Sequence, residues 1–344
     1  MWRLEADMAK AQKYEQAFWA MTKCEFFSIS QKKKRFPKTL YHTRAYNYLT
    51  ETEFKKYLTA PAEKLPLLHE NLFTHILNVP GKVFNQKEWM EYQKDNNKFP
   101  EYASITADEI LAVQKIFNYG NYISGNTEFS YYIAQLLDTN TCTYCNRQYT
   151  LTVVANNGDR IIRPEFDHWF AQSLYPDLAL SFYNLIPSCA LCNSILKNNK
   201  ETELDTHIHP YIDRNIGRDN HQGFKFSYIN LKIGEYAVIC DADTNNPDDR
   251  RRVENTLDLF KIQEVYNAHS NMELKDIIDL AHENGRDYIQ DLVQHVLSST
   301  TLKEEDIFRM LFGFEWSQQN YLKRPMSKFK HDIIKRLHDQ IING

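Results

Sequence analysis

The chain has 344 residues, 42% of them hydrophobic and 25% charged, which is the composition of an ordinary globular protein. This length is enough for about two or three subdomains. Its net charge of −4 excludes a general attraction to polyanions, so any contact with nucleic acid must rest on local basic patches. The sequence has no apolar run long enough to span a membrane and no signal-peptide pattern at its start, which predicts a cytoplasmic location.

The N-terminal region, residues 1–138, has a helical pattern. Thr106 and Glu109 have the spacing of a capping box, which predicts the start of a helix that ends near Gly120. A second helix is expected over residues 128–137, capped by the threonine before it. The chain contains only 10 glycines and 11 prolines, which favours a mainly α fold.

The segment 139–212 has a different, β-rich pattern. Residues 149–155 and 160–166 predict two strands of a hairpin, joined by an Asn-Asn-Gly-Asp turn. Residues 184–187 are expected to be extended, and a helix is expected to start within residues 189–197. Strands that lead into a helix predict a small ββα unit in this segment.

The C-terminal region, residues 213–344, predicts one more hairpin followed by helices. Its strands are expected over residues 224–233 and 236–240, with the turn at a Gly-Glu pair. From residue 250 to the end the pattern is helical, with a loop before it and breaks near residues 284–285 and 298–300. The last helix is expected over residues 328–341 and is basic at its start.

Four of the six cysteines form two pairs with the same spacing, Cys142–Cys145 and Cys189–Cys192. A C-x2-C pair can present two thiolates to one ion, so the two pairs predict a four-cysteine structural Zn2+ site. The alternatives are four unrelated buried thiols and a redox role. The redox role is disfavoured because neither pair has the βαβ surroundings of a thioredoxin-type motif. The ββα unit is too small to bury a core alone, so we expect zinc to contribute to its folding.

The two remaining cysteines and a pair of histidines are not expected to bind a metal. Cys24 and Cys240 stand alone and are expected to be small buried hydrophobic residues in a reducing compartment. His207 and His209 have the spacing that places both imidazoles on one side of a strand, but no cysteine is left to complete a metal site with them. A structural or surface role is therefore favoured for both histidines.

Asp167 and His168 lie between the two cysteine pairs, at the exit of a predicted strand. Neighbouring side chains on a regular strand point to opposite faces, so the two can serve one site only if the strand breaks into a loop here. His168 is then a candidate general base that takes a proton from a water molecule aligned with a phosphodiester. The duller interpretation is a histidine that packs among aromatic residues.

Asn193 follows Cys192 directly, so a bound zinc ion would fix the direction of its side chain. Asp167 and Asn193 offer oxygen ligands, which suit Mg2+ or Mn2+ better than a second zinc. Such an ion would polarise the scissile phosphate. Lys197 lies four residues after Asn193 on the same helical face, and the start of that helix offers free N–H groups to phosphate. Asp167, His168, Asn193 and Lys197 are therefore the candidate nuclease site.

These motifs resemble the zinc-stapled HNH (ββα-metal) endonucleases. The matching letters lie between Cys142 and Lys200 and read C-T-Y-C, F-D-H-W-F, Y-P-D-L-A-L and Y-N-L-I-P-S-C-A-L-C-N. Within the family, the Asp-His-aromatic-aromatic start and the Tyr-Pro-x-Leu insert look most like the PtuB nucleases of Septu antiphage systems and of some retrons. The chain departs from the pattern at Asn193, where many relatives have His, and at Ala171-Gln-Ser173, where relatives often have a Pro before the serine.

The resemblance implies hydrolysis of DNA phosphodiester bonds in bacterial antiphage defence, with an ABC-type ATPase as the partner protein. It implies His168 as the general base, Asp167 and Asn193 as ligands of a catalytic Mg2+ or Mn2+ ion, and the cysteines as the zinc staple. It also gives Asn184 the role of the middle asparagine, which braces the loop that carries the histidine. Taken by itself, Asn184 could instead cap a turn through its side chain.

The sequence thus predicts a mainly α protein with a small α+β module, in which a zinc-stapled ββα-metal nuclease unit lies between two helical regions. Two other functions stay open: a non-catalytic zinc-dependent module that binds nucleic acid or protein, and an HNH nuclease that cleaves RNA such as tRNA. Four basic clusters are candidates for contacts with backbone phosphates. They cover residues 31–35, 250–252, 323–324 and 328–336.

Overall fold

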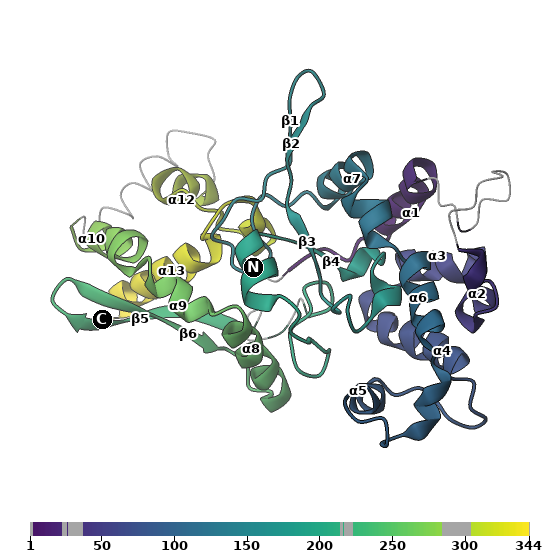
Figure 1. Cartoon of the computed structure of the whole chain (residues 1–344). Helices are drawn as coiled ribbons and strands as arrows, with labels where there is room; N and C mark the ends of the chain where they lie inside the picture. Colours follow the sequence, from purple (N-terminus) through teal and green to yellow (C-terminus); the bar gives the residue numbers. More distant parts are fainter. Residues whose placement is uncertain are drawn as a thin grey trace.

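The computed structural model describes residues 3–22, 26, 37–213, 216, 223–283 and 304–343 of the chain. It is mainly helical, with three small antiparallel sheets of two strands each among the described residues. The N-terminal helices lie on one side, the C-terminal hairpin and helices lie on the other, and the cysteine-bearing segment lies between them (Figure 1). This agrees with the predicted mainly α fold with a small β module, while the nuclease unit and the exact boundaries of the three regions stay predictions.

Among the described residues, the first side of the molecule contains seven α-helices. Helix α1 contacts α3 and α7, and α2 contacts α4 and α6. The hydroxyl of Tyr14 on α1 donates a hydrogen bond of 2.6 Å to the carbonyl of Leu180, which joins this helical region to the central segment. The bounds are α1 Met8–Thr22, α2 Arg44–Tyr48, α3 Glu51–Thr59, α4 Leu65–Leu77, α5 Gln86–Lys94, α6 Ala107–Ile116 and α7 Thr127–Leu137.

The two helix starts predicted in this region are correct to within one residue, but their capping bonds differ from those expected. Thr106 caps α6 as predicted, whereas the carboxylate of Glu109 is turned away from the cap and accepts bonds from the backbone of Arg44 and Ala45. The N-cap of α7 is Asn126, one residue before the expected threonine, and its side chain accepts from the N–H of Phe129. An asparagine caps at least as well as a threonine, which explains the shift.

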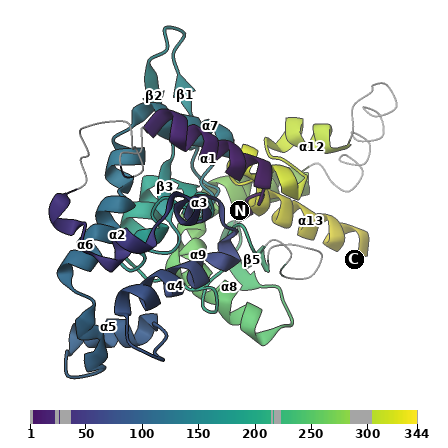
Figure 2. The same ribbon diagram turned by 90° about the vertical axis from the view of Figure 1, so that its right-hand side faces the viewer.

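The predicted hairpin of residues 149–166 is wrong in its second half. Strands β1 (Val153–Val154) and β2 (Arg160–Ile162) form only a short ribbon. Pro164 lacks a backbone N–H, and the chain changes partner there. The next strand, β3 (Glu165–His168), pairs with β4 (Leu185–Ser188) instead, with Asp167 opposite Ile186 and His168 opposite Leu185. The β1–β2 ribbon projects from the body in both views (Figures 1 and 2).

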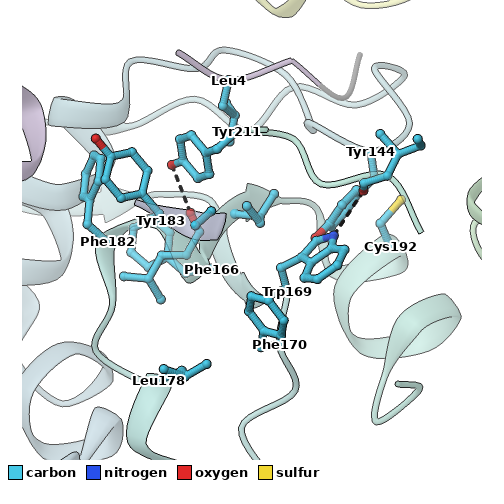
Figure 3. Packing of buried hydrophobic residues seen from close by; sticks show 14 of the residues in the cluster. Leu4, Tyr144, Phe166, Trp169, Phe170, Leu178, Phe182, Tyr183, Cys192 and Tyr211 are labelled. Atoms are coloured by element: carbon cyan, nitrogen blue, oxygen red, sulfur yellow. Dashed lines mark hydrogen bonds between the residues drawn. The ribbon is translucent and has the colours of Figure 1, made fainter. Parts of the chain in front are cut away.

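The β3–β4 pair is surrounded by buried aromatic side chains. Trp169 and Phe170 lie directly after β3, and the indole N–H of Trp169 donates to the carbonyl of Ile208 at 3.2 Å (Figure 3). Tyr211 donates to the carbonyl of Leu185 on β4, at 3.3 Å. After β4 the chain enters a helical segment, Leu191–Lys197, with π-type hydrogen bonds. A strand pair followed by a helical segment is therefore present, but its strands are β3 and β4 and not the two strands of the predicted hairpin.

The C-terminal hairpin is confirmed, with β5 (Phe224–Lys232) and β6 (Glu235–Ala242) in antiparallel register. The next helix starts earlier than expected, inside the predicted loop, because Asn246 caps it and Pro247 suits its first turn. The predicted breaks near residues 284–285 and 298–300 lie outside the described part of the chain. The helices are α8 Pro247–Leu259, α9 Ile262–Asn267, α10 Lys275–Glu283, α12 Glu304–Phe312 and α13 Ser327–Asn343.

One hydrophobic cluster runs through the helices on both sides and through the central segment. The residues before α1 also contact this segment, since the N–H of Leu4 donates to the carbonyl of Pro210 at 2.9 Å. Among the described helices, none combines the length and the apolar character that a membrane crossing needs.

Candidate functional site

The four paired cysteines converge on one point, as predicted. All four are buried, and their Sγ atoms lie within 4.8 Å of one another. A tetrahedral zinc ion with Zn–S bonds of about 2.3 Å separates its sulfur ligands by roughly 3.8 Å, and the Cys145 and Cys189 sulfurs are 4.0 Å apart. The cluster therefore fits a four-thiolate Zn2+ ion. Among the described residues it is the only such group of His, Cys, Asp and Glu side chains.

The first cysteine pair also holds the C-terminal part of the chain. Asn146, directly after Cys145, has a left-handed backbone conformation with φ of 50°. Its buried side-chain amide donates to the carbonyls of Tyr321 and Arg324, at 2.9 and 3.1 Å. Its carbonyl accepts from the N–H of Met326. The turn that carries two zinc ligands is thus fixed to the segment before α13.

Asp167 lies on β3 with both carboxylate oxygens engaged. Lys197 donates to Oδ1 at 3.0 Å, and the two side chains are only 1% and 3% exposed. The hydroxyl of Tyr144, from the first cysteine turn, donates to Oδ2. Lys197 also donates to the carbonyl of His168. The arrangement is a buried ion pair that connects β3 with both ends of the cysteine cluster.

This geometry does not fit the predicted divalent-cation site at Asp167. An ion on Asp167 would lie beside the Lys197 ammonium, and two positive charges in a buried site repel each other strongly. Lys197 was predicted to share a helical face with Asn193, and in the structure its ammonium is buried against β3. In the structure the Lys197 ammonium therefore neutralises the carboxylate of Asp167.

His168, the last residue of β3, is partly buried and has two defined contacts. Its Nε2 lies 3.0 Å from the carbonyl oxygen of Ala179. A carbonyl can only accept, so Nε2 carries the proton and Nδ1 keeps the lone pair. Its ring meets that of Tyr119 edge-on, with centroids 4.5 Å apart. Burial lowers the pKa of His168 to about 4, so the imidazole is neutral at pH 7 and chemically able to accept a proton.

Asn184 is fully buried and joins both ends of the long connection between β3 and β4. Its Oδ1 accepts from the N–H of Phe170 at 2.7 Å, and its Nδ2 donates to the carbonyls of Phe170 and Leu178. The Leu178 carbonyl immediately precedes Ala179, the acceptor for His168. Asn184 therefore spans more than a local turn, and it holds the segment that orients the His168 ring.

The side chain of Asn193 contacts β3, and the residue that it contacts there is Glu165. The amide of Asn193 donates to Oε2 of Glu165 at 2.9 Å, and the hydroxyl of Ser194 donates to the same oxygen at 3.1 Å. Glu165 precedes Asp167 by two residues, so both lie on one face of β3. The sequence contained this signal in the i, i+2 spacing of two carboxylates on a strand.

A cleft of about 860 Å3 brings three of the predicted residues together. Asp167, His168 and Asn193 line it from the central segment. The opposite wall is formed by the end of α6 and the turn that follows it, with Tyr119 closest to His168. The prediction missed this wall because nothing local in the sequence connects residues that lie about fifty positions apart. It also missed Arg163 and Glu165, which line the cleft as well.

His209, from the predicted histidine pair, and Lys328, from the last basic cluster, both make contacts inside the fold. His209 is fully buried, packs against Trp169 with ring centroids 4.4 Å apart, and accepts from the N–H of Tyr211. Lys328 is also fully buried and forms an ion pair with Asp332 at 3.0 Å, so it is unable to contact phosphate. Cys240 is partly buried. Cys24 and residues 31–35 lie outside the described part of the chain.

Comparisons with known proteins do not identify a relative. No family model matches the chain, and no curated protein or solved structure gives a match.

The cysteine cluster predicts a specific effect of thiol removal. Cys142→Ser should abolish stoichiometric zinc and unfold the central segment, because three thiolates no longer close the tetrahedron. Elemental analysis and near-UV circular dichroism of the purified variant measure both effects. Cys240→Ser, outside the cluster, is the matched control and should keep one zinc per chain. Full zinc in both variants would contradict the assignment.

The Asp167–Lys197 pair predicts a large stability effect. Lys197→Met should reduce the free energy of unfolding by about 3–5 kcal/mol, because it leaves a buried carboxylate without its counter-charge. The double variant Asp167→Asn, Lys197→Met should recover much of that loss. Urea denaturation measures both. As a control, Lys55→Met removes the exposed pair with Glu51 and should cost less than about 1 kcal/mol. A loss of unfolding free energy as small for Lys197→Met would show that the pair does not stabilise the fold as proposed.

His209 predicts a pH dependence of stability. Burial lowers the pKa of His209 to about 3 in the folded chain, whereas the unfolded chain protonates it near the ordinary value of about 6.5. Its contribution to stability is therefore complete above about pH 6.5 and is lost as the pH falls toward 3. The stability difference between wild type and His209→Phe should shrink over that window in urea denaturation series. A constant difference would show that His209 does not titrate in this way.

Proposed function

We propose that the chain is a metal-dependent HNH-type endonuclease that hydrolyses phosphodiester bonds in DNA. The observation that carries the proposal is the state of His168. It is neutral at pH 7, its ring is oriented by a carbonyl bond to Ala179, and it lines a polar cleft beside the cysteine cluster. A strand–strand–helix unit with the histidine on the first strand and a cysteine pair at the start of the helix supports the same assignment.

In this proposal, His168 accepts a proton from a water molecule through Nδ1. The water oxygen then attacks phosphorus as the bond to the leaving sugar oxygen breaks. Asn184 and Ala179 keep the imidazole in the required tautomer through the contacts described above. The resemblance assigns a Mg2+ or Mn2+ ion to Asp167 and Asn193. Because the buried Lys197 already neutralises Asp167, any such ion would require a rearrangement around this carboxylate.

The biological setting that we propose is bacterial antiphage defence, with an ABC-type ATPase as the partner. This part rests on the resemblance to PtuB nucleases alone. Co-purification with an ATPase encoded next to the gene tests it.

A second candidate function is a zinc-dependent module that binds nucleic acid or protein without catalysis. The occupied carboxylate of Asp167 favours it, because both oxygens already hold hydrogen bonds inside the fold. In that case the cleft binds a ligand, and His168 only contributes to packing against Tyr119.

Cleavage of plasmid DNA separates the two candidates. Wild type should convert supercoiled plasmid to nicked or linear forms with Mn2+, and His168→Ala should lower the rate by about 100-fold or more while zinc content stays unchanged. The matched control is His42→Ala, which removes an exposed histidine away from the cleft and should leave the rate unaffected. Equal rates for wild type and His168→Ala, or no cleavage with the partner present, would favour the binding module. The same assay with tRNA decides between DNA and RNA.

A further inference from the structure

Arg163 lines the cleft and is partly exposed. It follows β2 and precedes Pro164, at the base of the projecting ribbon. Among the described residues that line the cleft, Arg163 is the only lysine or arginine. The cleft has two acidic residues on the same wall, Glu165 and Asp167, and the charge of Asp167 is already balanced by the buried Lys197. Arg163 is thus the positive charge that an incoming anion would meet.

The guanidinium of Arg163 is held in place by neighbours that leave its charge uncompensated. It lies over the ring of Phe166, 5.1 Å from the centroid, and its Nη1 donates to the carbonyl of Pro164 at 2.7 Å. Within the described chain, no carboxylate lies within ion-pair distance of it. A guanidinium has five N–H donors in a rigid fork. With one bonded to Pro164, the others remain for a ligand.

Glu165 would be the expected counter-ion, yet its bonded oxygen points elsewhere. Its Oε2 accepts from Asn193 and Ser194, which draws the carboxylate toward the helical segment after β4. Glu165 therefore bonds to neutral donors and forms no ion pair with Arg163. A planar fork of this kind suits the two oxygens of a phosphate, and a stacked arginine loses little side-chain freedom on binding.

We propose that Arg163 binds a backbone phosphate of the nucleic-acid strand in the cleft, next to the phosphate that faces His168. The inference rests on the proposed function and adds a substrate-binding residue to it. The remaining lining is largely neutral and polar, with Gln114, Gln172, Asn198 and Asn199 as amides. One fixed cation among neutral amides recognises the backbone and not the base sequence.

The test measures binding separately from cleavage. Fluorescein-labelled DNA, as a single strand and as a duplex, is titrated by anisotropy in the His168→Ala background at several salt concentrations. Adding Arg163→Gln should weaken binding about 10-fold or more. It should also reduce the slope of log affinity against log salt by about 0.7–0.9, as expected for one lost phosphate contact. Arg163→Lys should restore most of the slope, because it restores the charge.

Arg309→Gln removes an arginine on α12 that pairs with Asp306, and its affinity and slope should match the background. An unchanged slope for Arg163→Gln would overturn the proposal even if affinity falls, because a purely structural role alters folding and not the number of phosphate contacts. The salt dependence of DNA affinity tests Arg163 even if the protein has no nuclease activity, because the assay measures binding alone. In the His168 wild-type background, Arg163→Gln should raise KM more than it lowers kcat.

Discussion

The convergence of four thiols is the constraint on which the rest of the site depends. It joins two turns whose cysteines are 44 residues apart in the chain. Closing a loop of this length costs entropy, and the binding free energy of a shared metal ion would offset that cost. Once the turns meet, Tyr144 from the first turn and Lys197 from the helix after the second turn reach the same carboxylate on β3. The position of β3 therefore follows from the cysteine cluster through two side-chain bonds.

The carboxylate of Asp167 is where the resemblance and the geometry diverge. An acidic residue before the histidine is expected to hold a cation, yet here its counter-charge is a lysine of the same chain. A buried pair of this kind contributes little net stability compared with apolar residues, but it strongly penalises loss of either partner. It therefore fixes the orientation of β3. His168, the next residue of the strand, receives its own carbonyl partner from the loop that Asn184 braces.

Local chemistry explains which parts of this arrangement the sequence could predict. The cysteine spacing, the hairpin of β5 and β6 and the helix starts near Thr106 and Asn126 are each decided by neighbouring residues, so they were predictable. Pro164 was visible in the sequence too, but its consequence depended on a second strand, β4, being available to pair with β3. The neutralisation of Asp167 was not predictable, because helical spacing alone does not tell whether Lys197 turns toward solvent or toward the strand.

The second wall of the cleft was the least predictable part, and it changes how the central unit is understood. Tyr119 follows α6, and α6 is held to the N-terminal helices by Glu109, which binds the backbone at the start of α2. The ring that covers His168 and helps to exclude water from it thus belongs to a different part of the chain. Burial is the largest cause of the lowered pKa of His168, so the helical region contributes to the chemistry of the imidazole. The ββα unit alone would present a more hydrated histidine, with a pKa closer to the ordinary value. The helices before it therefore form part of the candidate site as well as of the scaffold.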